Sequence, residues 1–413
     1  MDERRRLMMD QQRVVIDLSM VNNAGNPRES MTTANCYLVH RAGDYKLPLV
    51  YGNAIKNGAD NRVAYYPGEY STITNGINQF INHEGTPISG PWITKSTSGT
   101  GVNKGMGVTV NRAELLWQDA RGLISAVGID GDYLTFTVPT AASSKAGNAL
   151  IAAKSGSTIV WSWHIWVTTE TFASTTSIST TSRTYRVAPV NLGWIPTDGS
   201  GKQGYCPYYQ WGRKDPFIPS TGSENTNHIV YDISNSSIIG ITQQDSTTAT
   251  IADNIKNPTY LYYNSSTSGP NTTTYYNMWD ARNTKTNNVT TATKKTIYDP
   301  CPPGFCVPTG NLWYYFGGNA NPTSTNSRSD SNWDSTNKGK TWTLNGANIY
   351  FPATGTRNNR TGNISSIETG GCHWSASPYN GSNGRNLTFA STYWYWHNVD
   401  RALCYPIRAV VEE

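Results

Sequence analysis

Up to about residue 170, short apolar runs alternate with polar connections. The runs are rich in β-branched and aromatic residues and are bounded by Gly, Asn, Asp or Pro, which is the pattern of strands joined by turns. The expected strands are residues 13–21, 35–39, 45–51, 113–117, 133–138, 147–153 and 158–167. Their length and spacing predict an antiparallel β-sandwich.

The last of these runs illustrates how a strand distributes its side chains. Successive residues point to opposite faces of a sheet, so Trp161, Trp163 and Ile165 are expected on one face. Ser162 and His164 are expected on the other face. His164 is a candidate ligand or base, but the expected role of a histidine in such a strand is that of a hydrogen-bonded structural residue.

A Ser/Thr-rich stretch from Ser174 to Ser182 interrupts the apolar pattern. Because 413 residues exceed the usual size of a single core, two domains are expected. The predicted layout is a polar leader or remnant (1–12), an immunoglobulin-like β-sandwich (13–171), a linker (172–186) and a second domain (187–413).

The second half is richer in polar loops that carry isolated aromatic clusters. Two segments in it, residues 251–255 and 309–316, are expected to form short helices. Thr309 follows Pro308 and is the expected N-cap of the second of these helices. Regular structure is otherwise sparse, so buried aromatic side chains are expected to hold the loops in place.

Composition adds a supply of amphipathic aromatic residues. The chain has 14 Trp and 25 Tyr but only 8 Phe, and its mean hydropathy is −0.51. Tyr and Trp suit exposed contact surfaces as well as cores. Only 15% of residues are charged, and the net charge of +5 includes no basic run apart from Arg4–Arg6. A nucleic-acid partner is therefore not expected, and the composition favours an extracellular, all-β protein.

Motifs for catalysis and metal binding are missing from the sequence. There is no Gly-x-Ser-x-Gly, Walker, His-Glu-x-x-His or dinucleotide-binding motif, so no enzyme activity and no cofactor are expected. The six cysteines are scattered, and Cys301 and Cys306 lack the CxxC spacing, so structural thiols or one or two disulfides are expected rather than a metal site.

The sequence gives no sign of a membrane span or of a signal peptide. No run of 18 apolar residues exists, and the opening residues lack an apolar core. If the protein is exported, its leader is expected to lie upstream or to have been removed.

The C-terminal region contains the densest aromatic run, Tyr393–His397. Strand alternation would place Tyr393, Tyr395 and His397 on one face, and Trp394, Trp396 and Asn398 on the other. From these residues alone, a ligand-contact surface and a strand buried on both sides are equally open. Residues 355–363, with Arg357, Asn358, Asn359 and Arg360, are either a second loop beside the site or a solvated turn.

The first half contains the successive segments Ala34–Val39, Gly43–Pro48, Tyr51–Asn53, Ala113–Trp117, Gly147–Ile151 and Trp161–Trp166. In these segments it resembles the β-sandwich module of surface and fimbrial proteins of gut Bacteroidetes. The second half contains Tyr209–Pro216, Tyr298–Gly304, Val307–Pro308, Phe351–Ala353, His373–Pro378 and Arg408–Val410. In these motifs it resembles the Fibrobacter-succinogenes-major-paralogous domain, which has a C-type-lectin-like fold.

The C-terminal segment is also similar to the variable regions of proteins diversified by retroelements, in which template adenines are randomised. The invariant frame would be Trp374, Ser375, Ser377, Pro378, Leu387, Phe389, Trp394, Trp396, Arg401, Pro406 and Arg408. The variable positions would be Cys372, His373, Asn380, Ser382, Asn383, Asn386, Thr388, Ser391, Thr392, Tyr393, Tyr395, His397, Asn398, Asp400, Leu403 and Cys404. None of these is Trp, Met, Lys, Glu or Gln, which randomised Asn-type codons cannot encode.

Three departures from these relatives fall within or beside the variable segment. Cys372–His373 stands where an aromatic pair is usual, Cys404–Arg408 replaces Gly-Phe-Pro-Val-Arg, and Gly355–Arg357 replaces Gly-Tyr-Arg. They fall where diversification would act.

These resemblances imply a cell-surface or pilus-tip adhesin that binds a surface protein or glycan of a host, of another microbe or of a phage target. The implied ligand-binding residues are Tyr393, Tyr395, His397, Asn398, Asp400, His373, Cys372, Asn380, Ser382, Asn383, Thr356, Asn358, Asn359 and Leu403. A neighbouring pilin subunit is a further expected partner, through strand addition near residues 13–21.

Two alternatives stay open. A phage tail receptor-binding protein would use the same variable fold. A formylglycine-generating oxidase has a related fold, and Cys372 and Cys404 would then be its reactive thiols.

Overall fold

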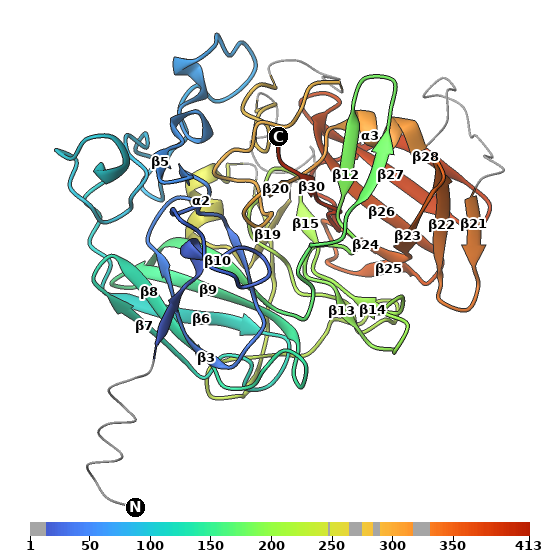
Figure 1. Cartoon of the computed structure of the whole chain (residues 1–413), viewed down its shortest axis with the longest axis horizontal. Coiled ribbons are helices and arrows are strands. Elements are labelled where there is room, and N and C mark those ends of the chain that lie inside the picture. The colour runs from blue at the N-terminus through green and yellow to red at the C-terminus, as the bar shows by residue number, and fades with distance from the viewer. Residues whose placement is uncertain (1–13, 247, 264–274, 284–289, 317–330) are drawn as a thin grey trace, which may run out of the picture.

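The protein is mainly β, and its strands form several sheets (Figure 1). The computed structural model describes residues 14–413 except 247, 264–274, 284–289 and 317–330. The predicted polar leader, residues 1–12, lies outside the described residues. The prediction of a mainly β protein is confirmed.

Two sheets face each other in the first half and share one buried apolar cluster. One sheet has the order β1 (Val15–Asp17), β3 (Gly43–Pro48), β8 (Tyr133–Val138) and β7 (Ala126–Asp130). The other has the order β17 (Ser237–Ile238), β16 (Val230–Tyr231), β6 (Arg112–Gln118), β9 (Gly147–Ser155), β10 (Thr158–Val167) and β2 (Cys36–Val39). Each of the seven predicted segments contains a strand, but β1 covers only three residues of 13–21 and the next three form η1 (Leu18–Met20). The pairs β1–β3 and β10–β2 are parallel, so the sandwich is not wholly antiparallel as predicted.

Shorter elements complete the first half. They are the strands β4 (Ile55–Lys56) and β5 (Ala59–Asp60), and the 3-10 turns η1 (Leu18–Met20), η2 (Arg62–Ala64), η3 (Pro67–Glu69) and η4 (Gly101–Asn103).

Strand β10 is buried on both faces, so His164 lies in the core. Its Nε2 is 2.9 Å from Asn148 Oδ1, and its Nδ1 is 3.3 Å from the Tyr209 hydroxyl. His164 is therefore the hydrogen-bonded structural residue that the strand pattern predicts.

Residues 172–186, the predicted linker, contain strands that pack on the second half. Strands β11 (Thr176–Ser179) and β12 (Thr184–Val187) form a hairpin. This hairpin joins β30 (Val410–Val411) and β20 (Phe305–Cys306) in a four-stranded sheet. Ile178 and Tyr185 are buried in it, so the polar serines and threonines mark the outer face of a strand pair.

A seven-stranded mixed sheet forms the centre of the second half. Its order is β15 (Tyr209–Gln210), β29 (Cys404–Tyr405), β24 (Thr354–Arg357), β26 (Gly370–Pro378), β27 (Asn383–Ala390) and β28 (Trp394–Asp400), with β25 (Ile364–Ile367) paired to β24. A second sheet of β21 (Ser331–Asp334), β22 (Gly339–Leu344) and β23 (Ala347–Pro352) lies beside it.

Helix α3 (Gly310–Phe316) packs between these two sheets, and α2 (Ile251–Lys256) lies against β10. Both helices agree with the predicted segments. The Thr309 hydroxyl is bonded to the Tyr185 hydroxyl at 2.6 Å, and the Gly310 N–H at the start of α3 donates to Ser377 Oγ at 3.0 Å. The remaining pairs are β13 (Ile195–Pro196) with β14 (Gly204–Tyr205), and β18 (Thr242–Asp245) with β19 (Tyr260–Tyr263).

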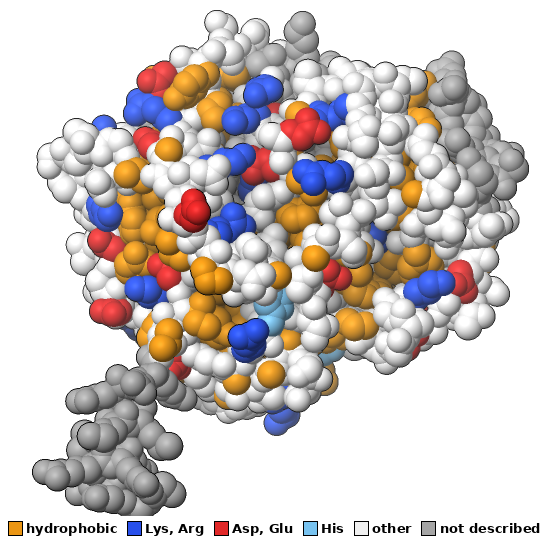
Figure 2. Space-filling model, viewed as in Figure 1, with side chains coloured by type: hydrophobic (Ala, Val, Ile, Leu, Met, Phe, Trp, Pro, Cys, Tyr) orange, Lys and Arg blue, Asp and Glu red, His pale blue; other side chains and the backbone are white. Residues whose placement is uncertain are grey.

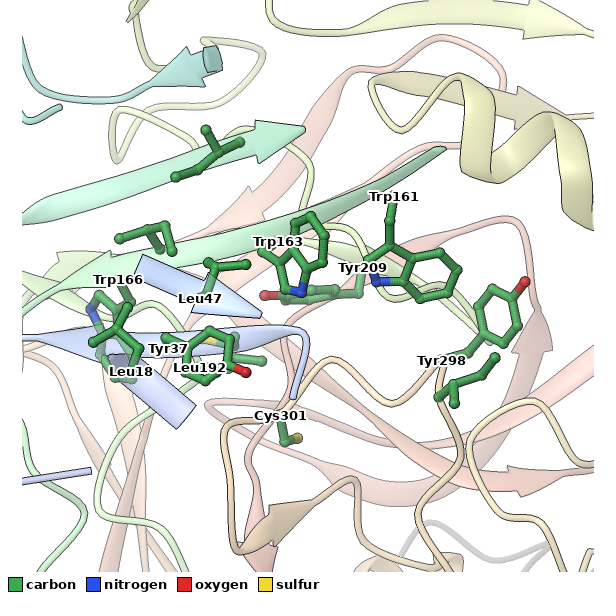
Figure 3. Packing of buried hydrophobic residues seen from close by; sticks show 14 of the residues in the cluster. Leu18, Tyr37, Leu47, Trp161, Trp163, Trp166, Leu192, Tyr209, Tyr298 and Cys301 are labelled. Carbon is green, nitrogen blue, oxygen red and sulfur yellow. The ribbon is translucent and has the colours of Figure 1, made fainter. Parts of the chain in front are cut away.

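The two halves share a core. Trp161 and Leu18 from the first half lie in one cluster with Tyr209, Tyr298 and Cys301 from the second (Figure 3). The Trp161 ring is 5.7 Å from that of Tyr298. In addition, β16 pairs with β6, so the second half supplies strands to a sheet of the first. The predicted boundary between the halves is therefore crossed by both the core and a sheet.

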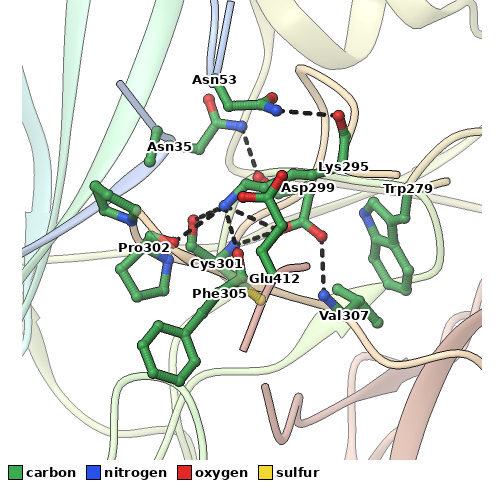
Figure 4. A network of polar contacts seen from close by, with 12 residues as sticks. Asn35, Asn53, Trp279, Lys295, Asp299, Cys301, Pro302, Phe305, Val307 and Glu412 are labelled. Carbon is green, nitrogen blue, oxygen red and sulfur yellow. Dashed lines mark hydrogen bonds and ion pairs between the residues drawn. The ribbon is translucent and has the colours of Figure 1, made fainter. Parts of the chain in front are cut away.

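A buried polar network also joins the halves (Figure 4). Asn35 Nδ2 donates to the carbonyls of Ile297 and Asp299 at 2.7 and 2.8 Å. Lys295 Nζ lies 3.4 Å from Asp299 Oδ1 and donates to the Phe305 carbonyl at 2.8 Å. Each buried charge thus has both a counter-charge and hydrogen-bond partners, which offsets the cost of its burial.

Charged side chains of both signs are interspersed on the face shown in Figure 2, among backbone and uncharged side chains. Within the described residues, no helix is long and apolar enough to cross a membrane.

Candidate binding face

The division of residues along β28 follows the predicted alternation. Trp394 and Trp396 are 3% and 8% exposed, whereas Tyr393 is 41% exposed. The two tryptophans pack toward α3: Trp394 Nε1 donates to the Phe316 carbonyl at 2.8 Å, and the Trp396 ring lies 5.4 Å from that of Tyr314. The tryptophans are therefore scaffold residues.

Tyr393, Tyr395 and His397 form what we call the aromatic ladder. The rings of Tyr393 and Tyr395 stack with centroids 5.5 Å apart and an interplanar angle of 19°. The His397 ring meets Tyr395 edge to face at 5.0 Å. Tyr393 and His397 are exposed and Tyr395 is half-buried, so the ladder offers a continuous aromatic surface.

Strand β27 supplies the neighbours of the ladder on the same face. Thr388 lies opposite Tyr395 and Asn386 opposite His397 in the strand register. Thr388 is half-buried and so belongs to the candidate surface, although the sequence-based set of contact residues omits it. Alternation from Leu387 and Phe389, both buried, is the signal that would have found it. Asn386 is fully buried, and its amide nitrogen donates to Thr388 Oγ1 at 2.7 Å.

A polar cluster lies at the end of β28. Its members come from three separate segments: Asn359, Asn380, Ser382, Asn383, Asn398 and Asp400. Asn383 Nδ2 lies 3.4 Å from Asn398 Oδ1, and Asn359 Nδ2 lies 3.3 Å from Asp400 Oδ2. The Asn380 side chain accepts the N–H groups of Ser382 and Asn383 at 2.8 and 2.7 Å. The structure thus brings together six residues that were predicted to bind ligand.

Two predicted contact residues lie in the interior instead. His373 is fully buried and Cys372 is 6% exposed, because β26 has strands on both sides and packed residues on both faces. The His373 ring stacks on Phe389, and its Nε2 is 3.0 Å from Asn191 Oδ1. Burial lowers the pKa of His373 well below its usual range, so it is neutral. Both residues are removed from the candidate site.

The segment 355–363 was predicted to be either a loop beside the site or a solvated turn, and it is more buried than either prediction implies. Arg357 is fully buried and donates to the carbonyls of Gly362 and Ile218 at 2.7 and 2.6 Å, and Asn359 is 5% exposed. The Asn358 side chain accepts two N–H groups of its own turn. Arg360 alone of the four named residues is exposed. Asn358 therefore acts mainly as a loop-fixing residue, which corrects its assignment as a ligand contact, whereas Asn359 is held in the polar cluster by its bond to Asp400.

The last two predicted contact residues are half-buried. The Thr356 hydroxyl lies 3.4 Å from that of Ser365. Leu403 packs against the large core. Neither joins the aromatic ladder by strand register.

Electrostatics keep the ladder uncharged near neutral pH. Burial, and secondarily the nearby positive Arg385, lower the pKa of His397. The Arg385 guanidinium lies over the rings of Trp396 at 3.9 Å and Tyr379 at 4.2 Å, and burial lowers its pKa to about 10. A surface of neutral aromatic groups suits ligands that bind through apolar contact and hydrogen bonds.

All six cysteines lie within the described residues, and all are buried free thiols. Burial raises the pKa of Cys372 to about 11 and that of Cys404 to about 12, so both are protonated at neutral pH. The thiolate is the reactive form of cysteine, so these positions are poor nucleophiles. Within the described part of the chain, no group of three or more His, Cys, Asp or Glu residues is placed to hold a metal ion.

A comparison with known protein families, a search of curated proteins and a search of solved structures each found no match to this chain. The functional proposal that follows therefore rests on geometry, on chemistry and on the motif resemblances of the sequence.

Proposed function

We propose that the protein is a surface adhesin whose aromatic ladder, with Thr388 and the polar cluster, binds a macromolecular ligand. The single observation that carries this proposal is the alternation along β28 and the residue before it, where exposed Tyr393 and His397 interleave with buried Trp394 and Trp396. Exposed, stacked aromatic rings leave apolar surface in contact with water and do not stabilise the core. They are the residues that protein-binding surfaces use for area at low entropic cost.

Diversification by a retroelement is the second part of the proposal. All members of the invariant frame are buried: Trp374, Ser375, Ser377, Pro378, Leu387, Phe389, Trp394, Trp396, Arg401, Pro406 and Arg408. Of the variable positions, only Cys372, His373, Asn386 and Cys404 are buried. A mechanism that randomises codons needs this separation, because a changed core residue costs folding free energy and a changed surface residue seldom does.

In the same proposal, the first half is an immunoglobulin-like sandwich and the second a C-type-lectin-like domain. The two sheets around one cluster support the former. The mixed sheet with α3 on one face and long loops supports the latter. The likeness to fimbrial proteins favours a pilus tip or cell surface as the location, and a surface protein or glycan as the ligand.

A pilin partner would approach β1, the short outer strand that pairs in parallel with β3. Val14, which precedes it, and Val15, its first residue, are 80% and 44% exposed. An added strand could pair along this edge.

The experiment is deep sequencing of this gene and its flanks from a growing population. The proposal predicts a template repeat matching codons 355–410 except at adenines, next to a reverse-transcriptase gene. It also predicts substitutions at codons 388, 393, 395 and 397, with none at 394 and 396. A uniform population, with no repeat beside the gene, would refute diversification. Adjacent pilin genes would favour the adhesin, and tail genes a phage receptor-binding protein.

A further inference from the structure

A second candidate site lies at the other end of the second half. It is an open pocket of about 190 Å³ between the β13–β14 hairpin, the turn at 220–222, the turn before β22, and the β23–β24 junction. In Figure 1, β13, β14 and β25 lie at the opposite end of this half from α3 and β28. The pocket therefore shares no residue with the aromatic ladder.

The floor of the pocket is aromatic and apolar, while its rim is polar. Trp194, Tyr208, Ala353 and Ile367 line the floor and are buried. The exposed rim carries hydroxyl, amide and charged side chains: Thr197, Gln203, Thr221, Lys338 and Glu368. An apolar base with a few convergent polar groups is the usual form of a small-ligand site.

Lys338 and Glu368 are fixed beside the same backbone residue. The Ala353 N–H donates to the Lys338 carbonyl at 2.9 Å, and the Glu368 N–H donates to the Ala353 carbonyl at 2.8 Å. Both charged residues have left-handed backbones, with φ of 53° and 59°. Residues other than glycine in this region are uncommon and are found at ligand sites more often than elsewhere.

Neither charged side chain is paired among the described residues. By contrast, the third charged lining residue, Lys202, has Asp334 at 3.3 Å. Lys338 and Glu368 thus both line the same small pocket, where their side chains can supply a hydrogen-bond donor and an acceptor.

We propose that this pocket binds a single sugar residue of a glycan. Each sugar hydroxyl both donates and accepts hydrogen bonds, so adjacent hydroxyls can engage Glu368 and Lys338 at once in charge-assisted bonds. The apolar C–H face of the sugar would pack over the aromatic floor. Glu368 would repel a purely anionic ligand, and Lys338 would repel a purely cationic one. The pair of opposite charges therefore favours a neutral, hydroxyl-rich ligand.

The test is saturation-transfer-difference NMR on the full chain with three free sugars: a neutral hexose, an N-acetylhexosamine and a hexuronic acid. Saturable binding of the hexose or the N-acetylhexosamine is expected, and Lys338→Met and Glu368→Gln should each weaken it about tenfold or more. Matched charge changes at exposed positions of the first half, Arg112→Met and Glu29→Gln, should leave it unchanged. Thermal unfolding of each variant checks that it folds.

Three outcomes would overturn the proposal. One is no binding of either neutral sugar at tens of millimolar. Another is sugar binding that persists in both pocket variants. The third is binding of only the hexuronic acid, or of the zwitterion glycine used as a competitor, which would assign the charges to an ionic ligand. None of these results bears on the aromatic ladder, so the proposed function would stand or fall separately.

Discussion

At the scale of single residues, the aromatic side chains along β28 and just before it differ in what they contact. Trp394 and Trp396 make their contacts inside the protein, with Phe316 and Tyr314, whereas Tyr393 and Tyr395 contact each other above the surface. The same type of side chain therefore has two physical roles at neighbouring positions. Amino-acid composition does not distinguish a buried aromatic residue from an exposed one, so the two roles are tested by substituting each residue.

Replacement of Trp394 and of Tyr393 by alanine is expected to have unequal effects on folding. Trp394→Ala should lower the free energy of unfolding by about 3–5 kcal/mol, since it leaves a cavity among buried rings. Tyr393→Ala should change it by about 0.5 kcal/mol or less, since its side chain is largely solvated. Urea unfolding measures both values. Comparable losses would mean that the ladder is part of the core.

Buried His164 should make folding sensitive to acid. Burial lowers its pKa to about 3, whereas the unfolded chain takes up this proton near the ordinary value of about 6.5. As pH falls from about 6.5 toward 3, only the unfolded state gains the proton, so the folded state loses about 1.4 kcal/mol per pH unit from this residue.

The measurement is urea unfolding of the parent and of His164→Gln at pH 6.5, 5.5 and 4.5. The glutamine should remove this loss, so the stability advantage of the parent over the variant should shrink at each lower pH. An advantage that stays constant over this range would contradict the assigned burial.

At the scale of elements, the β11–β12 hairpin shows what polar sequence can conceal. Only Ile178, Tyr185 and Val187 are buried in it, and its serines and threonines face outward. Ile178→Ala should therefore cost about 2–5 kcal/mol in urea unfolding, as a buried strand residue does. The adjacent exposed Ser177→Ala serves as the control and should cost little. Equal, small effects would restore the view of this segment as a linker.

The strands of the first half were predictable because each has a clear period of two or a continuous apolar run. The ladder was found by the same rule, applied to Tyr393–His397. His373 and Cys372 were misplaced because the rule says which residues share a face and not whether that face is covered. Only the packing of the folded chain, in which every residue of β26 is buried, shows that both faces are covered there.

The pocket beside Ala353 was not predictable for a different reason. Its walls come from segments far apart in the chain, and Lys338 and Glu368 meet only through backbone bonds to a third residue. No local pattern encodes such a meeting. Long loops in the second half were foreseen, but their mutual packing was not.

At the scale of the whole molecule, the two halves depend on each other. Trp161 packs on Tyr298, and Asn35 satisfies two carbonyls of the second half. Residues 14–171 expressed alone should thus lack a near-ultraviolet circular dichroism signal, and the full chain should unfold in one transition. A fragment that folds and melts near the temperature of the full chain would show that the halves are separate domains.

The most direct test of the central claim compares two libraries of the full chain displayed on yeast. One randomises Thr388, Tyr393, Tyr395 and His397; the other randomises the buried partners Leu387, Phe389, Trp394 and Trp396. We expect the first library to display at parental levels and to yield binders to lysozyme as a model protein target, and the second to lose display. Loss of display in the first library, or binders from the second alone, would contradict the assignment of the ladder as the binding surface.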